Sequence, residues 1–242
     1  MPPTSLAGRP AVVTGAGRGL GRAIALAFAR NGAPVACWAR TAAEVQETAA
    51  QARKAGVEAL ALVCDVTDPF QVAAALAQSE AALGPVHILV NNAGAFVVKP
   101  LAETSLDEFD CIVETNLRAP FACIKAVLPG MMARRRGCII NIASNAGKKP
   151  YVNQGAYTAS KHGLVGLSKV LAWEMREYGI RVAAICPGGI DTRLVAEARP
   201  DLDRTNWMKP AEVAETALFL ATLPAGVAVD EIVIRRFGAD PQ

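Results

Sequence analysis

Short apolar stretches alternate along this chain with longer segments of helical periodicity, and this alternation limits the possible folds more than any other feature. The short stretches are rich in Val, Ile and Ala and are apolar at successive positions, which is typical of strands buried on both faces of a sheet. They lie at residues 10–14, 34–39, 58–64, 87–91, 138–143, 181–186 and 229–234.

Segments with apolar residues three and four positions apart lie between these stretches, for instance at residues 20–31, 42–55, 72–83, 106–132 and 156–178. Strands that alternate with helices form parallel sheets through right-handed crossovers. No repeat or low-complexity linker divides the 242 residues. We therefore expect residues 1–242 to form one α/β domain, a doubly wound Rossmann-type fold with a seven-stranded, mostly parallel sheet and helices on both faces.

Residues that begin and end helices agree with this division. Thr67 or Asp68 can cap the third helix, and Gly84-Pro85 ends it. Gly32 and Gly56 follow the first two helices, where a left-handed residue commonly closes the last turn. The irregular segment at 188–210 is the longest loop candidate, and we expect it to select the substrate.

Charge and composition exclude several classes of protein. The 25 Lys and Arg against 22 Asp and Glu give a net charge of +3, too low for nucleic-acid binding. Only two histidines are present, which argues against a His-rich metal site, and we expect no metal. No apolar stretch reaches the length of a membrane span or a signal-peptide core. The six cysteines form no Cys-x-x-Cys motif and mostly follow apolar runs, so we expect buried thiols in a cytoplasmic protein without membrane or nucleic-acid partners.

A glycine-rich turn follows the first predicted strand and opens into the first helix. It reads Thr-Gly-Ala-Gly-Arg-Gly-Leu-Gly, with Gly15, Gly19 and Gly21 at its key positions and Leu20 at the helix start. Such a turn lets backbone N–H groups approach a diphosphate at a helix N-terminus. The spacing differs from Gly-x-Gly-x-x-Gly, and no Gly-Lys-Ser/Thr follows, so a nucleoside-triphosphatase loop is excluded.

The end of the second predicted strand indicates which dinucleotide binds. An acid in this place would hold the ribose 2′-hydroxyl of NAD, but the sequence has Ala39 followed by Arg40 and Thr41. Together with Arg18 in the glycine-rich turn, Arg40 would meet a 2′-phosphate with two guanidinium groups and no competing carboxylate. The sequence therefore predicts NADP(H) in preference to NAD(H).

Tyr157 and Lys161 lie four residues apart in a predicted helix, so their side chains share one face. A neighbouring ammonium lowers the pKa of a tyrosine toward the range useful for proton transfer. Ser144 follows the fifth predicted strand and therefore lies at the carboxyl edge, where ligands bind. These residues are the candidate catalytic group.

Taken together, these motifs identify the sequence as similar to the short-chain dehydrogenases/reductases over essentially its whole length. The motifs appear in the order of that family: the glycine-rich turn 14–21, Asp65-Val66, Asn91-Asn92-Ala93-Gly94, Asn116, Ser144, Tyr157-Thr-Ala-Ser-Lys161 and Pro187-Gly-Gly-Ile-Asp-Thr192.

The resemblance implies catalytic roles. Tyr157 would protonate the carbonyl oxygen as hydride reaches carbon, Ser144 would donate a hydrogen bond to that oxygen, and Lys161 would hold the nicotinamide ribose and lower the tyrosine pKa. Asn116 would kink the long fourth helix and hold a water against the lysine. His87 and His162 are assigned no chemistry.

The resemblance also implies cofactor contacts. Asp65 and Val66 would face the adenine. The segment containing Asn92, Ala93 and Gly94 would close the adenosine side. The remaining contacts, with the nicotinamide amide and the diphosphate, would come from Pro187, Gly188, Ile190 and Thr192.

The expected activity is NADPH-dependent reduction of a ketone, 3-oxo acid or 3-oxoacyl thioester to the secondary alcohol. NADP-dependent oxidation of a small hydroxy acid or sugar alcohol remains an alternative, as does a non-catalytic cofactor-binding sensor or scaffold. The C-terminal residues 229–242 lack the Val-Asp-Gly-Gly tail of many 3-oxoacyl reductases and resemble the family's small-carbonyl branch more closely. Similar proteins pair their long helices across two-fold axes, so we expect a homotetramer.

Overall fold

The computed structural model describes residues 5–239 and contains one seven-stranded sheet in the order β3-β2-β1-β4-β5-β6-β7. Every pair of neighbouring strands is parallel. The doubly wound, Rossmann-type prediction is thus confirmed, and each predicted strand is present to within two residues at either end. The strands are β1 (Ala11–Thr14), β2 (Val35–Ala39), β3 (Ala59–Val63), β4 (Ile88–Asn91), β5 (Gly137–Ile142), β6 (Ile180–Pro187) and β7 (Glu231–Ile234).

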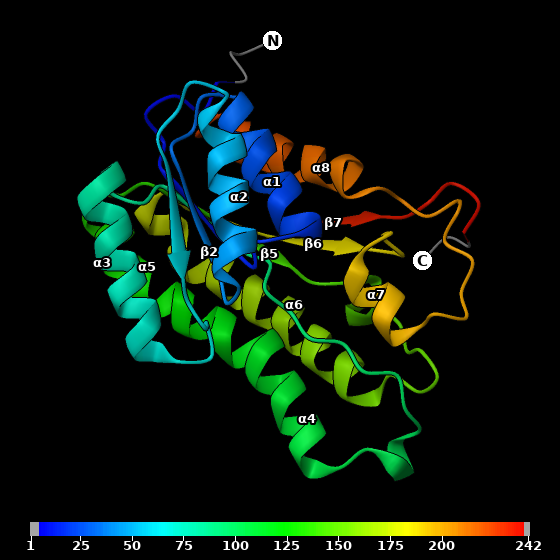
Figure 1. Ribbon diagram of the computed structural model, residues 1–242. Helices are drawn as coiled ribbons and strands as arrows, with labels where there is room; N and C mark the ends of the chain where they lie inside the picture. The colour runs from blue at the N-terminus through cyan, green and yellow to red at the C-terminus, as the bar shows by residue number, and fades with distance from the viewer. Residues whose placement is uncertain (1–4, 240–242) are drawn as a thin grey trace.

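Helices cover both faces of the sheet (Figure 1). One face carries α1 (Gly19–Arg30), α2 (Ala42–Arg53) and α8 (Pro210–Thr222); the other carries α3 (Pro69–Leu83), α4 (Leu106–Val113), α5 (Ala119–Arg134) and α6 (Gly155–Met175). A short helix, α7 (Arg193–Ala198), lies beyond the carboxyl ends of the strands.

Two hydrophobic layers hold this arrangement together. In β1, Val13 packs into the layer beneath α1 and α8, whereas its neighbour Val12 packs into the layer beneath α5 and α6. Successive strand residues point to opposite faces, so a sheet covered on both sides needs apolar residues at every position. Phe28 and Trp38 are completely buried, one in each layer, and each contributes roughly 1.5–3 kcal/mol through burial.

The residues observed at the helix ends agree with those predicted from the sequence. The Asp68 carboxylate caps α3, since its Oδ1 accepts hydrogen bonds from the backbone N–H groups of Phe70 and Gln71 at 2.8 and 3.3 Å. Asp68, rather than Thr67, is therefore the cap. Gly56 and Gly84 follow α2 and α3 with φ of 81° and 84°, a conformation that glycine adopts without strain.

A π-helical segment, η2 (Glu114–Arg118), interrupts the segment 106–132 between α4 and α5, and it contains Asn116, where the resemblance implied a kink. One expectation about helices needs correction. The segment 188–210 is not entirely irregular, since it contains α7, and α8 follows it directly. Pro210 opens α8, and the Glu212 carboxylate accepts a hydrogen bond from the backbone N–H of Lys209 at 2.6 Å. Within residues 5–239, no helix combines the length and apolar character needed to span a bilayer.

Candidate functional site

A cavity of about 720 Å³ opens at the carboxyl ends of the strands, where a doubly wound sheet binds its ligand. Its walls come from the glycine-rich turn, the ends of β2, β4, β5 and β6, the loop after β6 and the residues after β7. The predicted site residues line it, except Gly21 and Asn116, which lie just behind its wall. The structure therefore brings together residues that are far apart in the sequence.

The glycine-rich turn has the shape of a diphosphate cradle. Gly15 and Gly19 have φ of 63° and 55°, and a Cβ on Gly15 would lie 2.9 Å from the Cα of Ala93. A Cβ on Gly21 would collide with the carbonyl oxygen of Gly15. Because no side chain caps the N-terminus of α1, its first N–H groups remain free to bind an anion, so the turn fits a dinucleotide.

Hydrogen bonds fasten this turn to the segment after β4. The Thr14 hydroxyl accepts hydrogen bonds from the backbone N–H groups of Asn92 and Ala93, both at 3.0 Å. The Asn92 amide in turn donates to the carbonyl oxygen of Thr14 at 2.9 Å. These contacts fix the wall of the cavity that the glycine-rich turn and the segment after β4 form together.

Tyr157 and Lys161 lie on the cavity side of α6. The Lys161 Nζ is 5.6 Å from the centre of the Tyr157 ring and donates a 2.9 Å hydrogen bond to the carbonyl oxygen of Ile142. Ser144, at the end of β5, accepts a hydrogen bond from the N–H of Ala146 at 3.0 Å. The hydroxyl groups of Ser144 and Tyr157 and the Lys161 ammonium thus face one end of the cavity.

The electrostatics of this group differ from the expectation in one respect. Burial raises the pKa of Tyr157 above its ordinary value, and a hydrogen bond with Ser144 offsets this only in part. Burial also lowers the pKa of Lys161 to about 8. The prediction that Lys161 lowers the tyrosine pKa is therefore wrong for this structure, because the loss of solvent disfavours both charged forms.

Asn116 lies in the π-helical segment η2 and is completely buried. Its side chain accepts a hydrogen bond from the N–H of Ala95 at 2.8 Å and donates to the Ala95 carbonyl at 2.9 Å and to the Ser160 hydroxyl at 3.1 Å. The amide thereby ties the helix irregularity to the segment after β4 and to α6. Asn116 therefore lies buried at the point where the long helix is interrupted.

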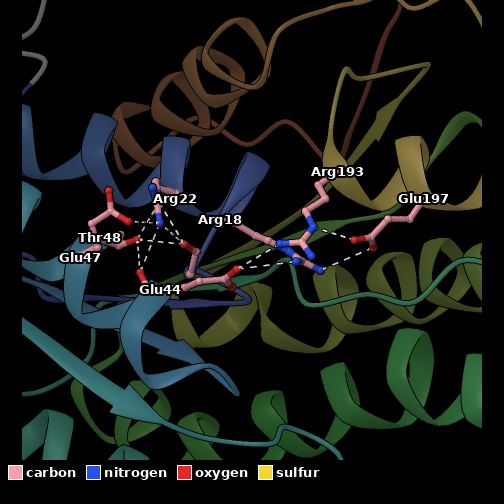
Figure 2. A network of polar contacts seen from close by, with 8 residues as sticks. Arg18, Arg22, Glu44, Glu47, Thr48, Arg193 and Glu197 are labelled. Carbon is pink, nitrogen blue, oxygen red and sulfur yellow. Dashed lines mark hydrogen bonds and ion pairs between the residues drawn. The ribbon is translucent and has the colours of Figure 1, made fainter. Parts of the chain in front are cut away.

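The end of the cavity beside β2 and the glycine-rich turn, where the adenosine is expected and which is called the adenosine end below, contains the predicted cations and one carboxylate that the sequence did not predict. Arg18, Arg40 and Thr41 line the cavity beside Glu44, whose Oε1 is 3.6 Å from the Arg18 Nη1 (Figure 2). The expectation that no carboxylate competes for Arg18 is therefore wrong. Glu44 lies in the first turn of α2, where its direction depends on how α2 packs against the glycine-rich turn.

Asp65 and Val66 lie at the turn after β3. The Asp65 carboxylate accepts hydrogen bonds from the N–H and hydroxyl of Thr67 at 3.0 and 2.8 Å, which shapes this turn. Val66 is buried, and both residues line the cavity beside the adenosine end.

The residues after β6 form the opposite wall. The N–H of Gly188 donates to the carbonyl of Ile234 at 2.8 Å, and Ile190 pairs with Met208. Thr192 is the N-cap residue of α7, and its hydroxyl accepts no hydrogen bond from the helix backbone, which leaves it available to a ligand. Pro187 lines the cavity with them.

Several lining residues were not predicted from the sequence. Phe96 packs edge-on against Tyr157, with ring centres 4.7 Å apart. Trp207 packs over Gly189, where a Cβ would lie 2.7 Å from the indole ring. Cations gather at the loop end of the cavity, namely Lys149, Arg199, Arg235 and Arg236. No short motif marks these positions, because the loop after β6 and the residues after β7 meet only in the folded chain. His87 and His162 do not line the cavity.

Comparison with known proteins gives consistent matches. A family model described as short chain dehydrogenase matches residues 9–203. The chain is 39% identical to an uncharacterized oxidoreductase of Bacillus subtilis, over 86% of this chain and 81% of that protein. It is 42% identical to a 3-oxoacyl-(acyl-carrier-protein) reductase of Pseudomonas aeruginosa, over 90% and 92% of the two chains. A crystal structure of an actinorhodin polyketide ketoreductase variant with NADPH superposes with a TM-score of 0.89 at 35% identity, covering 94% of this chain and 96% of the other.

Proposed function

The chain belongs to the short-chain dehydrogenase/reductase family, and on this premise we propose that it reduces a ketone, 3-oxo acid or 3-oxoacyl thioester to the secondary alcohol with NADPH. The observation that carries the proposal is the meeting of Tyr157, Ser144 and Lys161 at one end of a cavity whose other end is the glycine-rich cradle. A carbonyl bound between the two ends would lie beside both a reductant and a proton donor.

Each part of the cofactor has candidate contacts in this chain. The N–H groups at Gly19, Leu20 and Gly21 would hold the diphosphate, and the contacts to the adenosine and nicotinamide follow the expected positions at 65–66, 92–94 and 187–192. The bound NADPH supplies the hydride.

The protein's residues supply the proton and stabilise the oxygen. Tyr157 would donate its hydroxyl proton to the carbonyl oxygen, and the Ser144 hydroxyl would donate a hydrogen bond to the same atom. Burial raises the pKa of Tyr157, so its hydroxyl is protonated at neutral pH and can act as the proton donor. Lys161 would hold the ribose hydroxyls, and Asn116 would position the helix turn beside it.

Two arginines support the choice of NADP(H). Arg18 and Arg40 line the adenosine end, and β2 ends at Ala39 without the acid that would bind a ribose 2′-hydroxyl. The structurally similar ketoreductase contains NADPH. Glu44 opposes this preference, because its carboxylate lies beside Arg18.

The cations at the loop end of the cavity favour an acidic substrate. Lys149, Arg235 and Arg236 line this end together with Arg199, whose guanidinium is paired with Asp201 at 2.7 Å. Glu44 and Asp65, the acids among the lining residues, lie at the adenosine end. A 3-oxo acid, or a thioester with a phosphorylated carrier arm, would therefore find favourable charge near the loop 188–210, which we propose as the substrate-selecting segment.

We further propose a homotetramer in the cytoplasm. Phe121, Val170 and Trp173 expose 50%, 56% and 72% of their surface on α5 and α6, which is apolar area that a subunit interface would cover. Five of the six cysteines are buried and all six are free thiols, as in a reducing compartment. Light scattering tests the assembly: a tetramer supports it and a monomer contradicts it.

The experiment that tests the activity is a panel of ketones, 3-oxo esters, 3-oxo acids and a 3-oxoacyl thioester, followed by the oxidation of NADPH and of NADH. The proposal predicts turnover with NADPH and higher kcat/KM for the acidic members. Turnover with NADH alone would contradict the cofactor choice. Tight NADPH binding without turnover of any member would favour the non-catalytic alternative.

A further inference from the structure

The carboxylate of Glu44 lies between two guanidinium groups from different parts of the chain. Its Oε1 is 3.6 Å from the Nη1 of Arg18 in the glycine-rich turn and 3.8 Å from the Nη1 of Arg193 in α7 (Figure 2). All three residues line the cavity at its adenosine end. One anionic oxygen thus occupies a position where two cations converge.

A second carboxylate orients Arg193. Glu197 lies one turn further along α7, and its Oε1 is 2.6 Å from the Arg193 Nε, while its Oε2 is 4.0 Å from the Arg18 Nη2. Because Glu197 pairs with the Nε of Arg193, the Nη1 of the same guanidinium remains directed toward Glu44. Arg193 is therefore held toward the adenosine end rather than dispersed in solvent.

The pairing of Glu44 is loose enough to be replaced. Its two ion pairs are longer than a charge-assisted hydrogen bond of about 2.8 Å, and the side chains of Arg18 and Arg193 are 43% and 65% exposed. A phosphate monoester carries nearly two negative charges and three acceptor oxygens, whereas a carboxylate carries one charge and two oxygens. A phosphate at this position would displace the Glu44 carboxylate and pair with both guanidinium groups.

We propose that Arg193 is a third cation of the 2′-phosphate subsite, beside Arg18 and Arg40, and that Glu44 is the internal anion which the phosphate displaces. This inference rests on the NADP(H) preference of the proposed function and adds two residues with opposite effects on it. NAD(H) has a neutral hydroxyl at this position and leaves Glu44 between the two guanidinium groups.

The same contact connects the cofactor to the substrate loop. Arg193 begins α7, and Leu194, Val195 and Arg199 of the same segment line the cavity. A phosphate held by Arg193 fixes α7 to the glycine-rich turn through the ligand. NADP(H) binding therefore stabilises the position of α7 against the glycine-rich turn more than NAD(H) binding does.

The first test measures dissociation constants of NADP and NAD by titration calorimetry without substrate. Arg193→Gln is expected to weaken NADP binding roughly five- to tenfold, with NAD binding changed less than about twofold. Glu44→Gln is expected to tighten NADP binding about three- to fivefold, because the competing charge is gone. Glu47→Gln is the matched control, since Glu47 lies on the same helix but pairs with Arg22 at 3.1 Å outside the cavity lining, and it should change neither constant.

The outcomes separate this inference from the proposed function. If the wild type binds NAD as tightly as NADP, the cofactor choice fails and the inference fails with it. If the wild type prefers NADP and Arg40→Gln removes the preference, but Arg193→Gln leaves NADP binding unchanged, only the inference is wrong. Weaker NADP binding in Glu44→Gln would show that Glu44 holds the cofactor rather than competes with it, contrary to the inference.

Hydrogen exchange tests the connection to α7. At saturating cofactor, the amides of residues 193–198 are expected to exchange more slowly with NADP than with NAD, and Arg193→Gln is expected to abolish this difference. Equal protection of α7 by the two cofactors in the wild type would overturn the coupling. Thermal melting of each variant, expected within a few degrees of the wild type for substitutions of exposed side chains, confirms that the fold is intact.

Discussion

The Nζ of Lys161 lies 5.6 Å from the centre of the Tyr157 ring, one helical turn further along α6. The two side chains share the cavity face of α6, and the loss of solvent acts on them in opposite directions: it raises the pKa of the phenol and lowers that of the ammonium to about 8. Both groups are therefore shifted toward their neutral forms.

The buried Lys161 gives stability a specific pH dependence. Its pKa is about 8 in the folded protein and 10.5 when unperturbed, so the unfolded chain binds the proton more tightly between these values. The contribution of Lys161 to the free energy of unfolding therefore rises as pH increases from about 8 to 10.5. Urea unfolding of the wild type and of Lys161→Met across this range should show the difference between them shifting in favour of the wild type; a constant difference would contradict the lowered pKa.

Asn116→Ala should destabilise the protein by about 2 kcal/mol or more, because it removes the partners of the Ala95 N–H and carbonyl groups and of the Ser160 hydroxyl. The measurement is the free energy of unfolding in urea. His162→Ala, on the exposed side of α6, is the control and should change it by less than about 0.5 kcal/mol. Equal effects of the two substitutions would show that the Asn116 contacts contribute nothing specific.

Gly189→Ala should disturb the substrate loop without unfolding the protein. The added Cβ would lie 2.7 Å from the Trp207 indole, so the ring must move, and the loop wall moves with it. We expect a several-fold increase in KM for the carbonyl substrate with nearly unchanged NADPH binding. Gly226→Ala is the control, since Gly226 lies outside the cavity lining and a Cβ there would meet no atom within 4 Å. An unchanged KM in Gly189→Ala would show that this wall does not contact substrate.

Ser144→Ala should lower kcat by about 10²–10³-fold, because the substrate oxygen loses a hydrogen-bond donor where negative charge develops. The dissociation constant of NADPH should remain within about twofold, since the contacts of the cradle stay in place. Steady-state kinetics and calorimetry separate the two quantities. A loss confined to NADPH binding would assign Ser144 to the cofactor instead.

The sheet could be predicted from the sequence because both of its faces are covered. Val12 and Val13 pack into opposite layers, so the strand appears as a continuous apolar run and needs no knowledge of its neighbours. Gly15 and Gly21 could be identified as site residues from the sequence because only glycine fits at these positions. A Cβ on Gly15 would meet the backbone of Ala93, and a Cβ on Gly21 would meet the carbonyl oxygen of Gly15.

The remaining features depend on contacts between distant segments. Glu44 looks like a surface residue of α2 in the sequence, and only the packing of α2 against the glycine-rich turn and α7 places it beside Arg18 and Arg193. The apolar periodicity of residues 106–132 does not show the π-helical segment around Asn116, and only the family resemblance indicated an interruption there. The direction of the Tyr157 pKa was mispredicted because the sequence shows the nearby lysine but not the burial.

The kcat of carbonyl reduction in Tyr157→Phe tests the central claim most directly. The variant keeps the ring that packs against Phe96 and loses only the hydroxyl proton, while Tyr178→Phe, outside the cavity lining, serves as the control. With NADPH and the best carbonyl of the panel, we predict a decrease of about 10²–10⁴-fold in Tyr157→Phe, unchanged NADPH binding, and wild-type rates in the control. Reduction by Tyr157→Phe at the wild-type rate would contradict the account.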